Sequence, residues 1–221
     1  MKRLFPLALL CLALAGCGSP TVNFSLTFDT ADTQKQSELL QAATRVIGRR
    51  LSRFEGVTPE KVTAKPQGSG STLLTFDVQN TEARTTLVEE IQKPFSLRIM
   101  LLSPVEKGDI FVEEQGWFNE TGITEKDIGW VEASANERGK GVVRLVFTEQ
   151  GHARLAAVMS KNPTGVVGLF VRGRLMSKLQ VKGEELSKEI LIQDIPNPLL
   201  ADIFADDVNV GTHVTFSLSS S

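Results

Sequence analysis

The chain has 221 residues, of which 41% are apolar and 23% charged, and its formal net charge is −2. This length holds one domain or two small ones, and a slight acidic excess argues against a general nucleic-acid-binding protein. The only cysteines are Cys11 and Cys17, so the chain beyond them offers no thiol for a disulfide, a thiolate metal site or cysteine-based catalysis.

The first sixteen residues have the layout of a secretory leader. A short basic region precedes an apolar run over 4–15 that is too short to span a bilayer, which takes about 20 residues. The run ends in Leu14-Ala15-Gly16-Cys17, which resembles the bacterial lipobox. We therefore expect residues 1–16 to be a lipoprotein signal peptide, Cys17 to be lipidated, and 17–21 to form a flexible tether. The alternative is an ordinary signal peptide with an incidental cysteine.

Residues 22–102 predict the order β-α-β-β-α-β. Alternating apolar side chains indicate strands at 22–28, 62–65, 72–78 and 95–101. Helical spacing predicts a helix that opens with a capping box at Thr33 and Gln36, and another that follows Asn80. This is the ferredoxin-like order, so we assign 22–102 to a base domain and expect 210–218 to return to its sheet.

Residues 103–209 predict a second α+β unit, the head subdomain, inserted before that last strand. The pattern is weak over 103–140, where we expect a linker and an irregular start to the head. Further on, the sequence predicts strands at 142–147, 165–171 and 190–192, a tight turn at 172–174, and helices after Thr148 and Asn197. The expected fold class is α+β: a ferredoxin-like base with an inserted α+β head subdomain.

Several of these stretches resemble the periplasmic domain of the SecD family of protein-export membrane proteins. The matching pieces are 46–50, 56–57, 81–83 and 95–101 in the base, and 122–128, 143–151 and 169–177 in the head. The sequence departs from the family at Arg172, where the family has Asp, and at Lys178-Leu179, where it has Ala-Pro. The family's membrane part, which carries its proton-coupled residues, has no counterpart in this sequence.

The resemblance implies a non-enzymatic role in protein export, either binding of unfolded exported polypeptides or docking on Sec export subunits. We expect a bacterial cell-envelope protein, held by lipid on the extracytoplasmic side of a membrane. The alternative is an envelope scaffold or a ligand-binding lipoprotein that shares only the fold, since fold does not fix function. No cofactor or nucleic-acid partner is expected. His152 and His213 have no His or acidic partner four residues on, so no metal site is expected either.

One candidate binding surface follows the tight turn at 172–174. Its side chains are Leu175, Met176, Leu179 and Val181. If exposed, these adaptable apolar side chains would suit an unfolded polypeptide, and the strand they occupy would accept a peptide at its edge. The alternative is that they pack on the helix that follows Thr148.

A second candidate surface lies on the first helix. Arg45, Arg49 and Arg53 are spaced four residues apart, opposite the apolar stripe of that helix. Such a basic face predicts contact with anionic lipid headgroups close to the tether. The alternative is a solvated helix face with local ion pairs.

Overall fold

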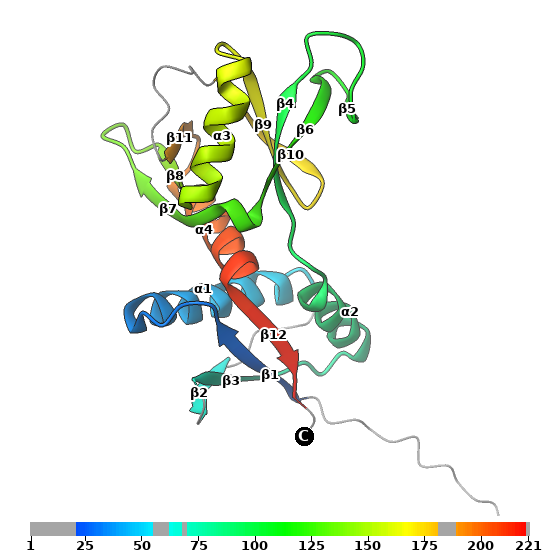
Figure 1. The fold of residues 1–221 in the computed structure, drawn as a ribbon. Coiled ribbons are helices and arrows are strands. Elements are labelled where there is room, and N and C mark those ends of the chain that lie inside the picture. Colours follow the sequence, from blue (N-terminus) through cyan, green and yellow to red (C-terminus); the bar gives the residue numbers. More distant parts are fainter. Residues whose placement is uncertain (1–20, 55–61, 68–69, 181–188, 220–221) are drawn as a thin grey trace, which may run out of the picture.

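The computed structural model describes residues 21–54, 62–67, 70–180 and 189–219. They form two α+β units, a base and a head. Helix α4 (Pro198–His213) runs from the head down into the base, where it continues directly into strand β12 (Val214–Leu218) (Figure 1). None of the helices in these ranges is long and apolar enough to cross a membrane.

The base is a four-stranded antiparallel sheet with two helices. The elements are β1 (Thr21–Phe28), α1 (Thr33–Leu51), β2 (Thr63–Gln67), β3 (Ser71–Asp77), α2 (Thr81–Gln92) and β12. The strand order is β12-β1-β3-β2, which is the ferredoxin-like arrangement with β12 as its last strand. The predicted α+β fold class is confirmed.

Alternation along β1 builds the core of the base. Val22, Phe24 and Leu26 are buried, and the Phe24 ring stacks against Phe76 of β3 at 6.2 Å between centroids. Burying side chains of this size stabilises the fold by about 2–3 kcal/mol each. The apolar stripe of α1 covers the same face through Leu39, Ala42, Ala43, Val46, Ile47 and Leu51.

Three of the four predicted helix starts are confirmed. The capping side chains are Asn80 for α2, Thr148 for α3 (Glu149–Lys161) and Asn197 for α4. Helix α1 is capped instead by Asp32, whose carboxylate accepts hydrogen bonds from the N–H groups of Gln34 and Lys35 at 2.9 and 3.2 Å. The capping box predicted at Thr33 is therefore wrong, because a stronger capping residue precedes it.

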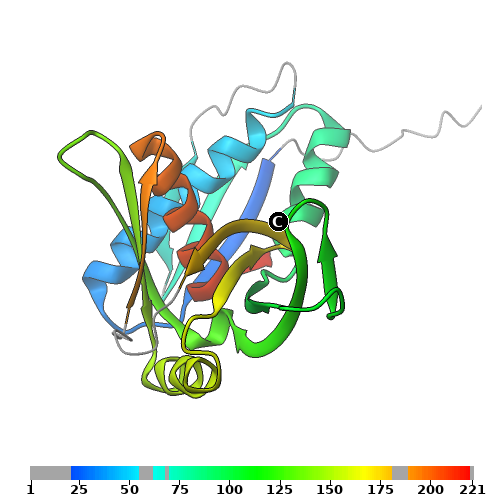
Figure 2. The same ribbon diagram turned by 90° about the horizontal axis from the view of Figure 1, so that it is seen from above.

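The head contains two sheets and helix α3. Its strands are β4 (Leu97–Leu102), β5 (Ile110–Val112), β6 (Gly116–Thr124), β7 (Ile128–Ala135), β8 (Gly141–Phe147), β9 (Val166–Val171), β10 (Arg174–Gln180) and β11 (Glu189–Ile195), with a 3₁₀ turn η1 (Glu125–Asp127) before β7. The five-stranded sheet has the order β10-β9-β4-β6-β5, and the three-stranded sheet the order β11-β8-β7. Helix α4 packs against β7 and β8, and the five-stranded sheet lies on its other side (Figure 2).

Strand β4 belongs to the head, so the assignment of 95–101 to the base sheet is wrong. It pairs with β6 on one side and β9 on the other. Because it is central, both its faces are buried: Leu97 and Ile99 face one core and Met100 the other. The place beside β1 is taken by β12, which starts only at Val214 because 210–213 continue α4.

The irregular stretch expected over 103–140 is also wrong, since β5, β6 and β7 lie there. Strand β6 is irregular where it pairs with β4. Glu120 opposes Met100 and Ile123 opposes Ile99, so Thr121 and Gly122, which has φ of 75°, are two extra residues on β6. The two buried apolar side chains of β6, Phe118 and Ile123, stand on either side of this irregularity and face different cores. The strand therefore shows no run of apolar side chains with a period of two.

Candidate functional site

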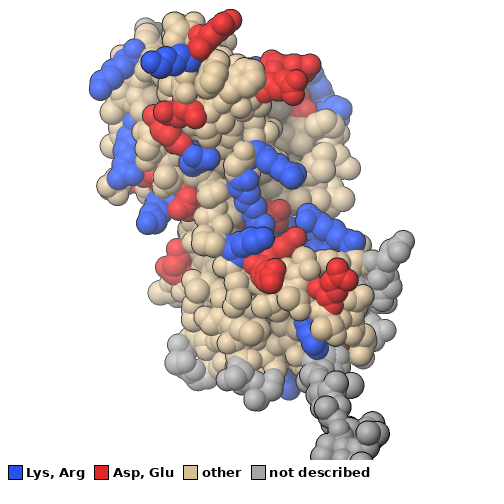
Figure 3. Space-filling view, turned by 90° about the vertical axis from the view of Figure 1, so that its right-hand side faces the viewer, with Lys and Arg blue, Asp and Glu red and all other residues tan. Residues whose placement is uncertain are grey.

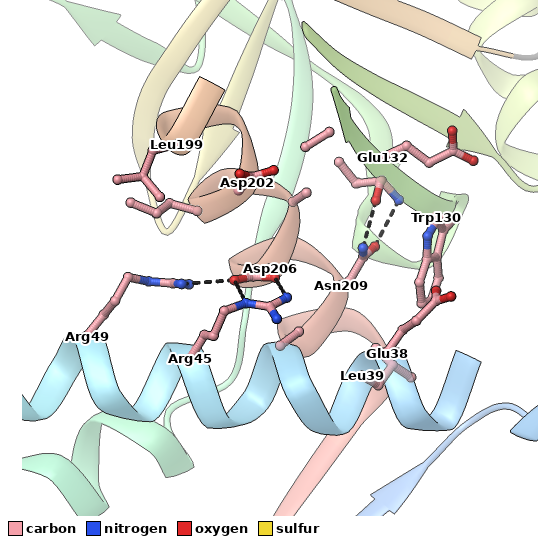
Figure 4. Close-up of a pocket in the computed structure, with 15 residues that line it drawn as sticks. Glu38, Leu39, Arg45, Arg49, Trp130, Glu132, Leu199, Asp202, Asp206 and Asn209 are labelled. Atoms are coloured by element: carbon pink, nitrogen blue, oxygen red, sulfur yellow. Dashed lines mark hydrogen bonds and ion pairs between the residues drawn. The ribbon is translucent and has the colours of Figure 1, made fainter. Parts of the chain in front are cut away.

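A hollow of about 650 Å³ lies where the head meets the base, between α1, α4 and β7 (Figure 4). We call it the groove. Helix α4 crosses α1 in its middle, and β7 flanks α4 on one side. The volume is within the range of about 300–1,000 Å³ typical of ligand sites.

One acidic side chain on α4 ties the head to the base. Asp206 is 6% exposed and accepts hydrogen bonds from Arg45 Nε at 2.9 Å, Arg45 Nη2 at 2.6 Å and Arg49 Nη1 at 2.9 Å. Arg49 Nη2 also donates to Asp207 at 3.2 Å. Burial by itself would raise the pKa of Asp206, but the hydrogen bonds and charges of both arginines outweigh it and hold that pKa below its ordinary value.

The side-chain amide of Asn209, also on α4, forms hydrogen bonds with the backbone of β7 as a neighbouring strand would. Asn209 Oδ1 accepts the N–H of Val131 at 2.9 Å, and Asn209 Nδ2 donates to the carbonyl of Val131 at 2.7 Å. These two bonds satisfy the outward-facing backbone groups of one residue of β7. They also fix the register of α4 against that strand.

A stack of side chains closes one end of the junction. The Trp130 ring of β7 stacks on His213 at 5.3 Å between centroids, and Lys35 Nζ lies 5.2 Å from the same Trp130 ring. His213 Nδ1 is 2.9 Å from the carboxylate of Asp29. His213 therefore ends α4 and joins the head to the base. Its acidic partner, Asp29, lies 184 residues away in the sequence, far outside the four-residue spacing at which the sequence shows none.

Part of the groove remains available to a ligand. Strand β7 pairs only with β8 among the described strands. Backbone groups alternate in direction along an antiparallel strand, so those of Ala133, which lines the groove, point to the same side as those of Val131. On the opposite wall Leu199 is 58% exposed. The groove thus combines an open strand edge with an exposed apolar side chain.

The charge of the groove favours cationic or apolar ligands. Its lining has four carboxylates, on Glu38, Glu132, Asp202 and Asp206, and two guanidinium groups, on Arg45 and Arg49. Both arginines are engaged by Asp206, and Arg144 pairs with Glu132, so Glu38 and Asp202 are the carboxylates of the lining that are left to attract a basic ligand. Within the described ranges, no three His, Cys, Asp or Glu side chains come together as a metal site.

The predicted hairpin surface divides between two cores. The tight turn at 172–174 is present, and a bulge between Leu175 and Ser177 changes the register of β10. Leu175 packs on the small core with Phe118 and Phe170, whereas Leu179 packs on the main head core, which includes side chains of α3. Met176 is 54% exposed, and Val181 lies outside the described residues.

The basic surface predicted on the first helix is divided as well. Arg45 and Arg49 contact Asp206, so their guanidinium groups are already paired across the junction. Arg53 is exposed and lies beyond α1, which ends at Leu51, so its placement on that helix is wrong. Contact of these three arginines with lipid stays a prediction. Lipidation of Cys17 also stays a prediction, because that residue lies outside the described ranges.

No protein-family model matches the sequence, and no curated protein matches it. Solved structures of SecDF do match. SecDF in its super-membrane-facing form aligns over 90% of this chain and 30% of its own, at 13% identity and a TM-score of 0.51. The chain has a SecDF-like fold.

Two further SecDF structures align over the same 90% of this chain. One is a membrane component that enhances protein export, covered over 99% of its chain at 13% identity and a TM-score of 0.49. The other is a translocon-associated membrane protein from Thermus thermophilus, covered over 30% at 14% identity and a TM-score of 0.48. At these identities the likeness to SecDF concerns the fold alone, so function must be argued from the groove.

Proposed function

We propose that this chain is a non-enzymatic, membrane-tethered module of the bacterial cell envelope that binds extended polypeptide segments in connection with protein export. The observation that carries the proposal is the groove, with the open edge of β7 at Ala133 and the exposed Leu199 facing it. The likeness in fold to SecDF, described as enhancing protein export, supplies the biological setting.

The groove suits an extended segment better than a folded partner. A peptide laid along β7 would pair with the backbone of Ala133, and main-chain pairing of this kind gives affinity with little dependence on sequence. Leu199 and Ile203 would contact alternate apolar side chains, and Glu38 and Asp202 would favour basic ones. A module of this kind accepts many clients, as an export function requires.

The tether forms the second part of the proposal. A lipidated Cys17 would hold the base close to a membrane surface, and residues 17–20, which precede β1, would let the module reach segments that emerge there. Replacing Cys17 by Ser is expected to release the protein from the membrane fraction. Mass spectrometry of the native protein that found an intact Met1 or an unlipidated Cys17 would overturn the tether.

Photo-crosslinking in living cells tests the binding site. A crosslinker at Leu199 is expected to capture exported polypeptides or Sec export subunits, and one at Leu218, which is 52% exposed on the base, serves as the matched control. Capture at Met176 but not at Leu199 would move the site to the β9–β10 hairpin. Capture of one unrelated envelope protein, or of no exported chain at either position, would contradict the export function and favour a scaffold.

A further inference from the structure

A second, smaller cavity lies at the other side of the contact between α1 and α4. It holds about 200 Å³ and is enclosed by α1, the end of α2, α4, β12 and the β9–β10 turn. Three basic side chains line it: Arg50, Lys93 and Arg172. We call it the basic cavity. In the face of the molecule shown in Figure 3, basic side chains gather at the waist between head and base.

The positive charge of the basic cavity is not neutralised from within. Of the residues that the structure describes, Asp207 alone brings a carboxylate to the lining, and it already accepts a hydrogen bond from Arg49 at 3.2 Å. Among the described residues, the guanidinium group of Arg50 has one hydrogen bond, to the backbone carbonyl of Glu90 at 3.3 Å. Burial, and next the charge of Arg172, lower the pKa of Arg50, against weaker opposing effects of Asp207 and Glu90. The half-buried Arg50 and the exposed Arg172 thus bring two like charges to one cavity.

The turn that carries Arg172 is an unusual place for this residue. Arg172 and Gly173 have φ of 49° and 77°, as in the two-residue hairpin turns that favour Asn-Gly or Asp-Gly. An arginine there costs backbone energy. The N–H of Arg172 donates to the carbonyl of Ser96 at 2.8 Å, and its guanidinium carbon lies 5.9 Å from the centre of the Phe95 ring. The bond to Ser96 and the contact with Phe95 thus hold this cation beside a second one, Arg50, in an arrangement that a bound anion would stabilise.

We infer that the basic cavity binds a small oxyanion of the phosphate type, held between Arg50 and Arg172 with Lys93 at its rim. The planar guanidinium fork matches phosphate oxygens, and an anion would supply the missing counter-charge. The volume lies below the range of drug-sized sites, which suits a phosphate group and excludes a nucleotide. The phosphate could be free or could belong to a lipid headgroup, and the inference does not depend on polypeptide binding in the groove.

Titration of the purified chain with inorganic phosphate, followed by calorimetry and thermal unfolding, tests the inference. We expect saturable binding and a rise in Tm beyond that in sodium chloride of equal ionic strength. Arg172→Asn keeps the turn, because Asn tolerates positive φ, and is expected to weaken binding about tenfold or more, as the loss of one charge-assisted contact implies. Arg53→Gln is the matched control: Arg53 is exposed beyond the end of α1 and does not line the cavity, so loss of its charge, which acts on Arg50 only from a distance, should weaken binding much less than Arg172→Asn does.

Two results would overturn the inference: no stabilisation beyond that of sodium chloride, or an equal loss of binding in Arg53→Gln and Arg172→Asn. A short-chain phosphatidic acid, used below its micelle concentration, separates the two sources of phosphate. Tighter binding of this lipid than of inorganic phosphate, lost in Arg172→Asn, assigns the site to a headgroup. Equal or weaker binding assigns it to free phosphate.

Discussion

The groove and the basic cavity lie on two sides of the contact between α1 and α4, but the arginines in them have different neighbours: a carboxylate in the groove and another cation in the basic cavity. In the groove, Arg45 and Arg49 face Asp206, a buried carboxylate that accepts three hydrogen bonds from them. In the basic cavity, Arg50 faces Arg172, another cation. The first arrangement stabilises the junction by itself, whereas the second is complete only when an anion is supplied from outside.

This difference predicts which side chains serve the fold and which serve a ligand. Substitutions of Asp206 and Asn209 on the groove side of α4 should lower stability, because these side chains already have partners within the chain. Substitution of Arg172 should instead raise stability, because it removes an unfavourable backbone conformation and the repulsion between Arg172 and Arg50. The predictions below test this contrast, from the largest expected effect to the smallest.

The largest effect is expected at Asn209. In Asn209→Ala, the N–H and carbonyl of Val131 lose their partners in a buried place, and each unsatisfied group costs about 1–3 kcal/mol. We expect the free energy of unfolding to fall by about 3 kcal/mol, measured by urea denaturation. Asp202→Ala, an exposed change on the same helix, should stay within about 0.5 kcal/mol of the parent. Equal losses in the two variants would show that the amide clamp is unimportant.

Asp206→Asn should have the next largest effect. Removing one partner of a fully buried ion pair costs about 3–5 kcal/mol, but the Arg45 side chain is 54% exposed, so solvent screening reduces this to about 2 kcal/mol. Asp207→Asn is the matched control: Asp207 is 42% exposed with one contact at 3.2 Å, and its loss should cost less than about 1 kcal/mol. A neutral result for Asp206→Asn in the same urea denaturation would mean that packing alone holds α4 on α1.

The loss of stability in Asp206→Asn should depend on pH, because the pKa of Asp206 is lowered in the folded state. A carboxyl group whose pKa is lower in the folded state stabilises the fold fully above its unfolded pKa, near 3.8, and loses this contribution as the pH falls through its folded pKa. The stability difference between the parent and Asp206→Asn should therefore be full near neutral pH and narrow in acid below 3.8. Urea midpoints of both proteins across this pH range measure the stability difference. A difference that widened in acid would contradict the prediction that Asp206 stabilises the fold in its ionised form.

The smallest effect has the opposite sign. Arg172→Asn relieves an unfavourable φ of 49° and removes a charge that faces Arg50. We expect a gain of about 0.5 kcal/mol in the absence of phosphate, read as a small rise in Tm. The same variant should lose phosphate binding, so stability and binding would change in opposite directions. A destabilised Arg172→Asn would place Arg172 with the structural arginines of the groove.

The sequence by itself determined the local elements. The caps at Asn80, Thr148 and Asn197, the alternation along β1 and the turn at 172–174 depend on residues a few positions apart, and backbone geometry restricts such short patterns to few conformations. The α+β class followed from the order of these elements. The same local reasoning missed β6, whose two buried apolar side chains, Phe118 and Ile123, stand on either side of an irregularity and form no run with a period of two.

Only the tertiary structure decided how those elements share two cores. Strands β4 and β12 both have suitable apolar patterns, and which of them joins the base depends on the path of α4, which contributes to both cores. Asp206 meets Arg45 across 161 positions of sequence and Arg49 across 157. Contacts at such separations are selected by the packing of whole faces, so the groove and the basic cavity exist only once α4 has crossed α1.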